Sequence, residues 1–575
     1  MPSAMENSIP FTDIYRKLRV KVPNAPGKLL RQKKADTTYV YYEIDRIYIP
    51  EKKNTRPKRV VIGKLSKRDP DMMQPNENFL RYFPGEDLPE EVDRAGRSSC
   101  LKIGTYMVIS KLFKESGILD VLSNYFTPKD LGLFLDLAAY SITEESNVAQ
   151  YYPCYAYDHP LFTKDMRIYS DSKVSDFLSQ ITDDQSTGFL NDWNSGRNYR
   201  EKIYISYDST NKNCQAGDIE MIEFGHAKED KGLPIFNYSI GFDTTNKEPL
   251  FYEQYPGSIN DVSQLQYALD KAKSYGYKKI GFILDRGYFS MQNIHYMDEC
   301  GYSFIIMVKG CATLVRDLIN QRAGTFEKKR TNFIPEYKVY GTTIKSKLKI
   351  TDQKDRYFHI YYSSSRESAE ENVINSRIEN MKKFLMKHVN EVKDFGPAYE
   401  KYFYLHHDEE TGAFVYPEEK THVIDDEIAH CGYFAIITSQ KMSAKEAIEL
   451  YKSRDASEKL FRGDKTYLGD RSLRVYSDES AASKIFIEFV ALIIRCRMYT
   501  CLKDAAKESE SKQNYMNVPA AIRELEKIEM VRQLDGVYRL DHAVTATQKT
   551  ILKAFGINPE HVKYKAAYIS DLLKK

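Results

Sequence analysis

Apolar side chains recur at intervals of three and four residues in the segment 103–192, which is the spacing of one face of an α-helix. The pattern is carried by Ile118, Val121, Leu122, Leu131, Phe134, Leu135 and Ala138. It predicts a small helical domain, to which we assign residues 96–198.

From Lys202 onward the pattern changes to short runs of apolar, β-branched and aromatic residues. These runs predict strands over residues 203–208, 235–243 and 249–255, and the polar turn at 244–247 makes the last two antiparallel. The elements expected next are a helix over 261–275, a strand over 279–285, a helix over 291–300 and a strand over 303–308. Three strands followed by helix, strand, helix and strand predict an α/β core with a mixed sheet.

Residues 311–432 interrupt this order and are rich in Tyr, Lys and Glu, with a strand-like run at 357–362 and a charged helix near 364–392. We interpret them as an insertion into the core. Core-like sequence returns with a strand over 433–438. A helix then begins after Ser443, because Glu446 three residues later has the spacing of a capping box. Apolar helices over 481–502 and 518–528 complete the predicted order.

The first 95 residues predict a β-hairpin, with strands over 38–48 and 58–65 around a charged, turn-like segment at 51–57. Residues 1–70 hold 17 Lys and Arg against 7 Asp and Glu, a local balance of +10 in a chain of formal net charge +3. Such a local surplus is typical of an arm that binds nucleic acid or another polyanion. A solvated basic tail over residues 16–34 fits the charge equally well.

The length of 575 residues and the 42% apolar content are enough for more than one core, so we expect several domains. Eight cysteines without a Cys-x-x-Cys pair fit a reducing compartment, and we expect a cytoplasmic protein without a cleavable signal. The most apolar stretch, residues 485–494, carries Glu488 and is followed by Arg495. It predicts a buried core helix and not a membrane span.

Two carboxylates end predicted strands of the core. Asp208 stands in the run Tyr-Asp-Ser-Thr, and Asp285 follows an apolar strand in Leu-Asp-Arg-Gly-Tyr. Side chains at strand ends converge on ligands in α/β sheets. Because Asp also caps turns after strands, either residue alone fits a structural role as well.

The helix after Ser443 carries Tyr451, Arg454, Glu458 and Lys465 at spacings of three, four and seven residues. At about 100° per residue these side chains form one narrow polar stripe. A solvated face with an Arg454–Glu458 ion pair is one interpretation. Arg454 and Lys465 are expected to be exposed in the free protein.

Chemistry gives the second interpretation of the stripe. Three carboxylates, two from strand ends and Glu458 from the helix, would coordinate two Mg²⁺ ions through hard oxygen ligands. Such a pair stabilises the attacking and leaving oxygens of an in-line phosphoryl displacement. Arg454 and Lys465 would then hold nearby phosphates, and Tyr451 would bond to a phosphate oxygen or stack on a sugar or base.

The sequence resembles the DDE transposases of bacterial insertion sequences, in the group with a Y-x2-R-x3-E-x6-K signature. Tyr451, Arg454, Glu458 and Lys465 match that signature without a gap. The companion motifs follow in the family's order, at residues 207–210, 225–228, 255–261 and 285–289. The resemblance covers roughly residues 200–475.

The resemblance implies a DNA transposase that cuts transposon ends and joins their 3′-hydroxyls to target DNA. It implies metal binding by Asp208, Asp285 and Glu458, two Mg²⁺ ions for which Mn²⁺ can substitute, and a homodimer that bridges two terminal inverted repeats. The implied fold is a ribonuclease H-like core with a mostly β insertion. The expected domains are a DNA-binding region with a β-hairpin (1–95), a helical domain (96–198), the core (199–310 and 433–510), the insertion (311–432) and a C-terminal helical region (511–575).

The better-known relatives use a Trp of the insertion to hold a flipped base during hairpin formation. The only Trp here, Trp193, lies outside the insertion and is expected to be a core or interdomain anchor. Other aromatic residues of the insertion could stack on a base, so the route of excision stays open. These aromatic candidates are Tyr337, Tyr340, Tyr402 and Phe403.

Two other functions stay open on the sequence: a nuclease that cleaves without joining, and a domesticated DNA-binding protein without catalysis. The intact carboxylate triad argues against the second. His226 could help to bind substrate, although a lone His is more often structural. His406 and His407, next to Asp408, are adjacent on an extended segment, so their side chains point to opposite faces and do not suit one metal ion.

Overall fold

The computed structural model divides the chain into two units, which are described separately. Unit 1 comprises residues 1–111, 150–171 and 501–575, and unit 2 comprises residues 112–149 and 172–500. Within these, the structure describes residues 19–50, 53–66, 69–83, 97–196, 202–214, 216, 219–225, 227, 232–259, 261–277, 279–308, 313–349, 351–455, 473–509 and 517–573.

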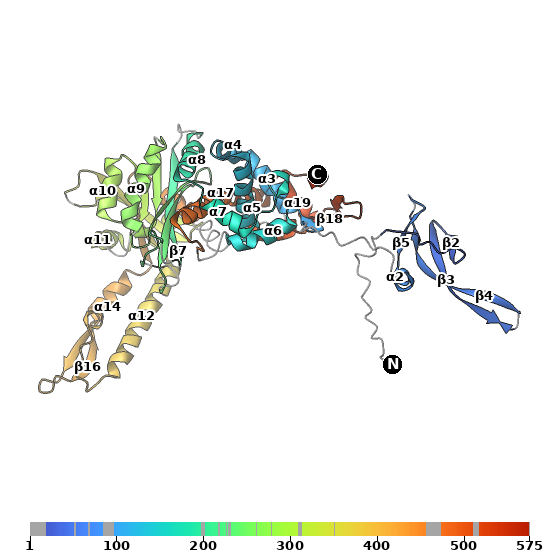
Figure 1. The fold of residues 1–575 in the computed structure, drawn as a ribbon. Helices are drawn as coiled ribbons and strands as arrows, with labels where there is room; N and C mark the ends of the chain where they lie inside the picture. The colour runs from blue at the N-terminus through green and yellow to red at the C-terminus, as the bar shows by residue number, and fades with distance from the viewer. Residues whose placement is uncertain are drawn as a thin grey trace. The chain divides into compact units, whose positions relative to one another are not determined.

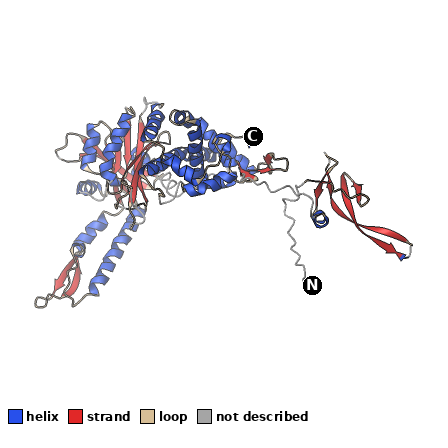
Figure 2. Ribbon diagram, in the orientation of Figure 1, coloured by secondary structure: helices blue, strands red, loops and turns tan. Residues whose placement is uncertain are grey.

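A mixed sheet of nine strands forms the centre of unit 2 (Figures 1 and 2), in the order β12-β13-β14-β17-β11-β10-β7-β8-β9. Strands β7, β8 and β9 are antiparallel, while β10 runs parallel to both β7 and β11. This confirms the predicted α/β core with a mixed sheet. The strands are β7 (Ile203–Asn213), β8 (Ile235–Asp243), β9 (Glu248–Pro256), β10 (Ile280–Leu284), β11 (Ser303–Met307), β12 (Phe333–Ile334), β13 (Val339–Lys347), β14 (Asp355–Tyr362) and β17 (Tyr433–Thr438).

Helices follow the core strands as predicted, with α9 (Asp261–Ser274) after β9 and α10 (Met291–Glu299) after β10. The helix α15 (Ala444–Lys452) packs Ala447 and Ile448 on one face of the sheet, against Ile283, Ile305 and Ile436. The long helix α17 (Asp478–Glu508) includes the apolar stretch 485–494, whose side chains are buried, as predicted. In the part of the chain that the structure describes, no helix is long and apolar enough to span a membrane.

The predicted helical region is indeed helical, but its helices are divided between the two units. In unit 2, α8 ends beside β9, where Trp193 is buried and its indole Nε1 donates to the carbonyl of Pro249 at 3.0 Å. Trp193 is therefore a core anchor, as expected. The helices are α3 (Gly104–Glu115), α4 (Ile118–Ser123), α5 (Pro128–Glu144), α6 (Tyr152–Asp158), α7 (Asp171–Leu178) and α8 (Asp183–Ser195).

The insertion supplies β12, β13 and β14 to the large sheet, and its residues 364–432 form an arm with a core of its own. In Figure 1, α12, α14 and β16 group together apart from the large sheet. The expectation of a mostly β insertion is wrong, because its helices have 10, 23, 4 and 9 described residues against strands of 2, 9, 8, 5 and 6. The remaining elements are α11 (Thr313–Arg322), α12 (Ser364–Met386), α13 (Pro397–Glu400), β15 (Phe403–His407), β16 (Phe414–Glu419) and α14 (Thr421–Ala429).

The physical reason is the length of α12. Its buried residues Ile374, Ile378 and Leu385 lie four and seven positions apart, so they share one helix face and pack on Phe403 and Phe414 of the β15–β16 hairpin. A two-stranded hairpin is marginal by itself, and the helix supplies the apolar surface that it needs.

The N-terminal part of unit 1 is a five-stranded sheet in the order β1-β5-β4-β3-β2, with α2 (Glu77–Tyr82) packed on it. It contains the predicted hairpin. However, β4 begins at Asn54, because the segment 54–57 pairs with the end of β3 instead of forming a turn. Pro57 is tolerated there, since this end of β4 is an edge. The strands are β1 (Val20–Lys21), β2 (Leu29–Lys34), β3 (Thr37–Ile49), β4 (Asn54–Leu65) and β5 (Met72–Pro75).

The C-terminal region contains the expected helices but also a hairpin, which the sequence analysis missed. Its strands extend a small sheet in the order β19-β18-β6, in which β18 pairs antiparallel with both neighbours. The elements are β6 (Cys100–Lys102), α18 (Val518–Leu525), β18 (Glu529–Arg532), β19 (Tyr538–Leu540), α19 (Ala546–Ala554) and α20 (Pro559–Leu573).

Candidate active site

The two aspartates lie on neighbouring strands in matching register. Strands β7 and β10 are parallel, and Tyr207 of β7 pairs with Leu284 of β10. Asp208 directly follows Tyr207, and Asp285 directly follows Leu284. Tyr207 and Leu284 are fully buried on one face of the sheet. Because side chains alternate along a strand, the Asp208 carboxylate points to the other face. Asp285 directly follows β10, and its contact with Tyr451 of α15 places its carboxylate on that same face, at the end of a strand about 4.8 Å away.

The prediction that Asp208 ends its strand is wrong. Strand β7 continues to Asn213, because residues 209–213 pair with the first half of β8, between Ile235 and Ser239. Asp208 nevertheless lies at the level where the neighbouring strand β10 ends, and its carboxylate accepts a hydrogen bond from the backbone N–H of Ser209 at 2.9 Å. The strand end that opens the site is therefore that of β10.

Three donors converge on one oxygen of Asp285. Its Oδ1 accepts from the backbone N–H of Arg286 at 2.6 Å, from Arg454 Nη1 at 2.9 Å and from the Tyr451 hydroxyl at 3.4 Å. The Asp285 side chain keeps 40% of its surface exposed, whereas that of Arg454 keeps only 10%. The carboxylate thus reaches solvent while its cationic partner is covered by protein.

The helix α15 brings Tyr451 and Arg454 to this position. It begins with the predicted capping box, in which Ser443 and Glu446 bond to each other's backbone N–H. Tyr451 is buried on the apolar face, and the guanidinium of Arg454 lies 5.0 Å from the centre of its ring. The expectation that Arg454 is exposed is therefore wrong, because the side chain turns back over Tyr451 toward Asp285.

The predicted polar stripe is only partly described. The helix α15 ends at Lys452, and Arg454 lies one residue beyond its C-cap, Ser453. Glu458 and Lys465 lie outside the described residues, as do His226 and Lys228 of the companion motif. The structure therefore brings together Asp208, Asp285, Tyr451 and Arg454 of the predicted set. Among the residues that it describes, no group of three or more His, Cys, Asp or Glu side chains is arranged to hold a metal ion.

The adjacent histidines His406 and His407 of the insertion have separate partners. His406 Nε2 lies 2.9 Å from a carboxylate oxygen of Glu418, and its ring stacks on Tyr416 at 4.3 Å. His407 Nδ1 donates to the carbonyl of Gly412 at 3.3 Å. They contribute to the hairpin of the arm.

A cavity of about 580 Å³ lies beside Asp285 and was missed by the sequence analysis. Its lining includes Arg286, which directly follows Asp285, and three further arginines from α11 and α12. The four cationic side chains are Arg286, Arg316, Arg366 and Arg377. No local motif could have revealed the cavity, because these residues come from three segments of the chain.

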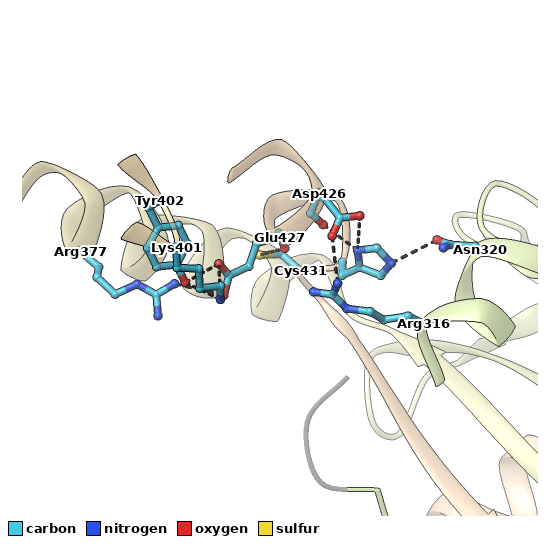
Figure 3. A network of polar contacts seen from close by, with 9 residues as sticks. Arg316, Asn320, Arg377, Lys401, Tyr402, Asp426, Glu427 and Cys431 are labelled. Atoms are coloured by element: carbon cyan, nitrogen blue, oxygen red, sulfur yellow. Dashed lines mark hydrogen bonds and ion pairs between the residues drawn. The ribbon is translucent and has the colours of Figure 1, made fainter. Parts of the chain in front are cut away.

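A polar network holds the base of the arm next to this cavity (Figure 3). Arg316 of α11 pairs with Asp426 of α14 at 3.0 Å, and His430 Nε2 lies 3.1 Å from Asn320 Oδ1. Deeper in the arm, Glu427 accepts from Arg377 and from the Tyr402 hydroxyl. Burial acts to raise the pKa of Glu427, but the Tyr402 hydrogen bond and the charges of Lys401 and Arg377 hold it below its usual value.

The sequence profile of the family described as "Transposase DDE domain" matches residues 203–494, more than half of the 575-residue chain. The chain belongs to the DDE transposase family. The matched segment of this transposase runs from β7 into α17 and includes both aspartates, Tyr451 and Arg454. Members of the family are DNA-cleaving and DNA-joining enzymes and generally depend on divalent metal ions.

No curated protein matches the sequence. Among solved structures, the transposase is similar to a piggyBac transposase synaptic complex with hairpin DNA, with 9% sequence identity and a TM-score of 0.36. The likeness covers 81% of this chain and 83% of that chain.

Proposed function

We propose that this DDE transposase cleaves the ends of a bacterial insertion sequence and joins the freed 3′-hydroxyls to target DNA by two-metal phosphoryl transfer. Asp208, Asp285 and Glu458 are the proposed metal ligands. The observation that carries the proposal is the matched register of Asp208 and Asp285 on β7 and β10, which directs two carboxylates to one face of the sheet.

The donor set fits a pair of divalent ions. Carboxylate oxygens are the ligands that Mg²⁺ prefers, with Mn²⁺ as a substitute. Glu458 follows Arg454 by four residues, which span at most about 14 Å of extended chain. Since Arg454 contacts Asp285, the third carboxylate is tethered within reach of the first two. When bound, the two ions would stabilise the attacking and leaving oxygens of the displacement.

The strand order supports a ribonuclease H-like core. The part β9-β8-β7-β10-β11 contains three antiparallel strands followed by two parallel ones, each reached through a helix. In this arrangement Asp208 lies on β7 and Asp285 directly follows the neighbouring strand β10, and α15 covers the same face. The residues of that face therefore orient the scissile phosphate, with Arg454 and Lys465 as the proposed phosphate contacts.

The basic sheet of unit 1 supports a role in DNA binding. Its strands β2, β3 and β4 present exposed cationic side chains, among them Arg31, Lys33, Lys34, Arg56, Lys58 and Lys64. A surface of this charge neutralises phosphates of a duplex. We propose that it holds the terminal inverted repeats, and that a homodimer bridges the two ends.

The test is cleavage and joining of a duplex that carries the inverted repeat flanking the gene. The wild-type protein is expected to nick and to transfer strands with Mg²⁺ or Mn²⁺. Asp208→Asn, Asp285→Asn and Glu458→Gln should each lower cleavage by more than about 100-fold while end binding persists, because a ligand charge is lost but phosphate contacts remain. Glu449→Gln, the same change on an exposed residue of α15, is the matched control and should keep full activity.

The alternatives give distinct products in the same assay. Nicking without strand transfer indicates a nuclease, and binding without either product indicates a DNA-binding protein that has lost catalysis. Equal loss of binding and cleavage in the three variants would assign the carboxylates a structural role.

A further inference from the structure

The carboxylate proposed as a metal ligand is also one half of an ion pair. Arg454 Nη1 lies 2.9 Å from Asp285 Oδ1, and the Tyr451 hydroxyl donates to the same oxygen at 3.4 Å. Protein covers all but 10% of the Arg454 side chain, so water screens the pair less than it would a surface pair. A guanidinium held in this way neutralises the charge that attracts a divalent cation.

We propose that Arg454 couples DNA binding to metal binding at Asp285. In the protein without DNA its guanidinium opposes a divalent cation at Asp285, and a DNA phosphate draws the guanidinium away so that the carboxylate can bind the ion. This inference rests on the proposed function and adds the order of binding: DNA engagement raises the affinity for metal.

The positive charge of Arg454 explains why its guanidinium opposes a divalent cation at Asp285. A cation on either oxygen of Asp285 would lie within a few ångströms of the guanidinium, where like charges repel strongly in a partly buried site. The carboxylate would in addition have to give up its hydrogen-bonded partner. Metal affinity should therefore be low while Arg454 stays at Asp285.

The position and chemistry of Arg454 allow its guanidinium to leave Asp285 for a DNA phosphate. The planar fork of a guanidinium matches the oxygens of a phosphate and binds them bidentately. Arg454 lies one residue beyond the C-cap of α15, whereas Ile448 and Tyr451 hold the helix on the sheet. The side chain can thus turn toward a phosphate while the helix stays packed.

The test measures Mn²⁺ binding directly, by the loss of the free-ion signal in electron paramagnetic resonance. Titrations use the full-length protein alone and with a duplex of the inverted repeat. Arg454→Gln alone should bind Mn²⁺ about 10- to 100-fold more tightly than wild type, within the usual range of coupling between two binding sites. The duplex should tighten Mn²⁺ binding by a similar factor in wild type, and only slightly in Arg454→Gln.

Two variants separate the ion pair from general charge. Lys452→Gln removes the same charge two residues away, from an exposed side chain paired with Asp455 at 3.9 Å, and should bind Mn²⁺ like wild type. Arg454→Lys keeps the positive charge, so its Mn²⁺ binding should also remain weak in the absence of DNA. Because binding is reciprocal, Mn²⁺ should tighten duplex binding in wild type by the factor found above.

The outcomes are distinguishable. If Asp285→Asn loses Mn²⁺ binding but Arg454→Gln binds no more tightly than wild type and Lys452→Gln, the coupling is refuted and the metal-ligand assignment stands. If Asp285→Asn binds Mn²⁺ as wild type does, Asp285 is not a ligand, and both the proposed function and the coupling are refuted.

Discussion

A buried ion pair joins strand β7, which carries Asp208, to the long helix α17, and breaking it should destabilise unit 2 strongly. Lys212 is fully buried, and its Nζ lies 2.6 Å from Glu488 Oε2. The other oxygen of Glu488 accepts from Asn147 Nδ2 at 2.5 Å. The perturbation is Glu488→Gln, which keeps the shape of the side chain and removes its charge.

The expected cost comes from the charge that stays behind. Removing one partner of a buried pair typically costs about 3–5 kcal/mol, because the other charge is left uncompensated in a low dielectric. The loss of Glu488 also affects the neighbouring Lys484. Burial lowers the pKa of Lys484 to about 8, and the negative charge of Glu488 opposes that shift, so Glu488→Gln removes part of what stabilises the charged form of Lys484. We therefore expect Glu488→Gln and Lys212→Met each to lower the unfolding free energy of unit 2 by about 3–5 kcal/mol.

The double variant Lys212→Met with Glu488→Leu should be far more stable than the sum of the single changes Lys212→Met and Glu488→Leu predicts. Replacing both members of a buried pair by apolar residues is often neutral, because neither charge of the pair is left without its partner. The difference between the double variant and the sum is the coupling of the pair, and we expect at least about 2 kcal/mol.

The assay follows Trp193 fluorescence during urea unfolding. This residue is the only Trp of the chain and is buried in unit 2, so its signal reports on the unit that contains the pair. Asp355→Asn breaks an exposed pair of the same sheet, with Lys345 at 2.7 Å, and should leave the midpoint unchanged. The predicted role of the pair would be refuted if the single variants lowered the free energy of unfolding by less than about 1 kcal/mol. It would also be refuted if the effects of the two single changes simply added in the double variant.

Two further predictions concern unit 1. Burial acts to lower the pKa of His159, but hydrogen bonds to Asp158 and Glu526 raise it to about 9, above the ordinary 6.5. The protonated His159 therefore contributes its full stabilisation below pH 6.5, and this stabilisation is lost as the pH rises toward 9. The melting temperature of the wild type should fall over this pH window, whereas that of His159→Gln should stay constant. An equal fall in both proteins would contradict the assignment. Deleting residues 16–68 should weaken duplex binding and reduce the slope of log affinity against log salt by about 0.9 for each lost phosphate contact, and an unchanged slope would assign the basic surplus to solubility.

Local pattern was sufficient where an element is buried and continuous in sequence. The strand predicted at 433–438 is β17, and the helix predicted at 291–300 is α10. Each has a buried apolar face and a clear cap or turn at its boundary, for example the Ser290 N-cap of α10. Such segments carry their structural signal in a few neighbouring residues.

The local sequence pattern failed to predict strands in polar segments that pair with a neighbouring strand through their backbone. Residues 209–213, Ser-Thr-Asn-Lys-Asn, look like a loop but complete β7, because β8 pairs with them from more than twenty residues away. The segment 54–57 became strand in the same way, through pairing with β3. Backbone hydrogen bonds to a partner strand satisfy polar segments that show no apolar alternation.

The two strand-borne aspartates could be predicted because each follows an apolar run, but the contacts around them could not. The sequence suggested a local pair between Arg454 and Glu458, which lies outside the described residues, but it gave no sign that Arg454 also pairs with Asp285, on a distant segment. Likewise, Glu488 stood out only as a charge inside an apolar stretch, and nothing near it pointed to Lys212. Ion pairs across a fold depend on strand register and helix packing, which periodicity does not encode.

The two long-range cations, Lys212 and Arg454, differ in how much of each pair reaches solvent. Asp208 and Asp285 occupy matching positions on one face of the sheet, where a positive charge favours their ionised forms. Lys212, four residues after Asp208 on that face of β7, is fully committed to Glu488 deep in the core. Arg454 instead pairs with the solvent-reaching carboxylate of Asp285. Protein covers the Lys212–Glu488 pair almost completely, whereas, in the coupling proposed above, the solvent-reaching carboxylate of Asp285 exchanges Arg454 for a metal ion when a phosphate binds the guanidinium. The location of the two pairs thus separates the structural charge from the one suited to DNA binding.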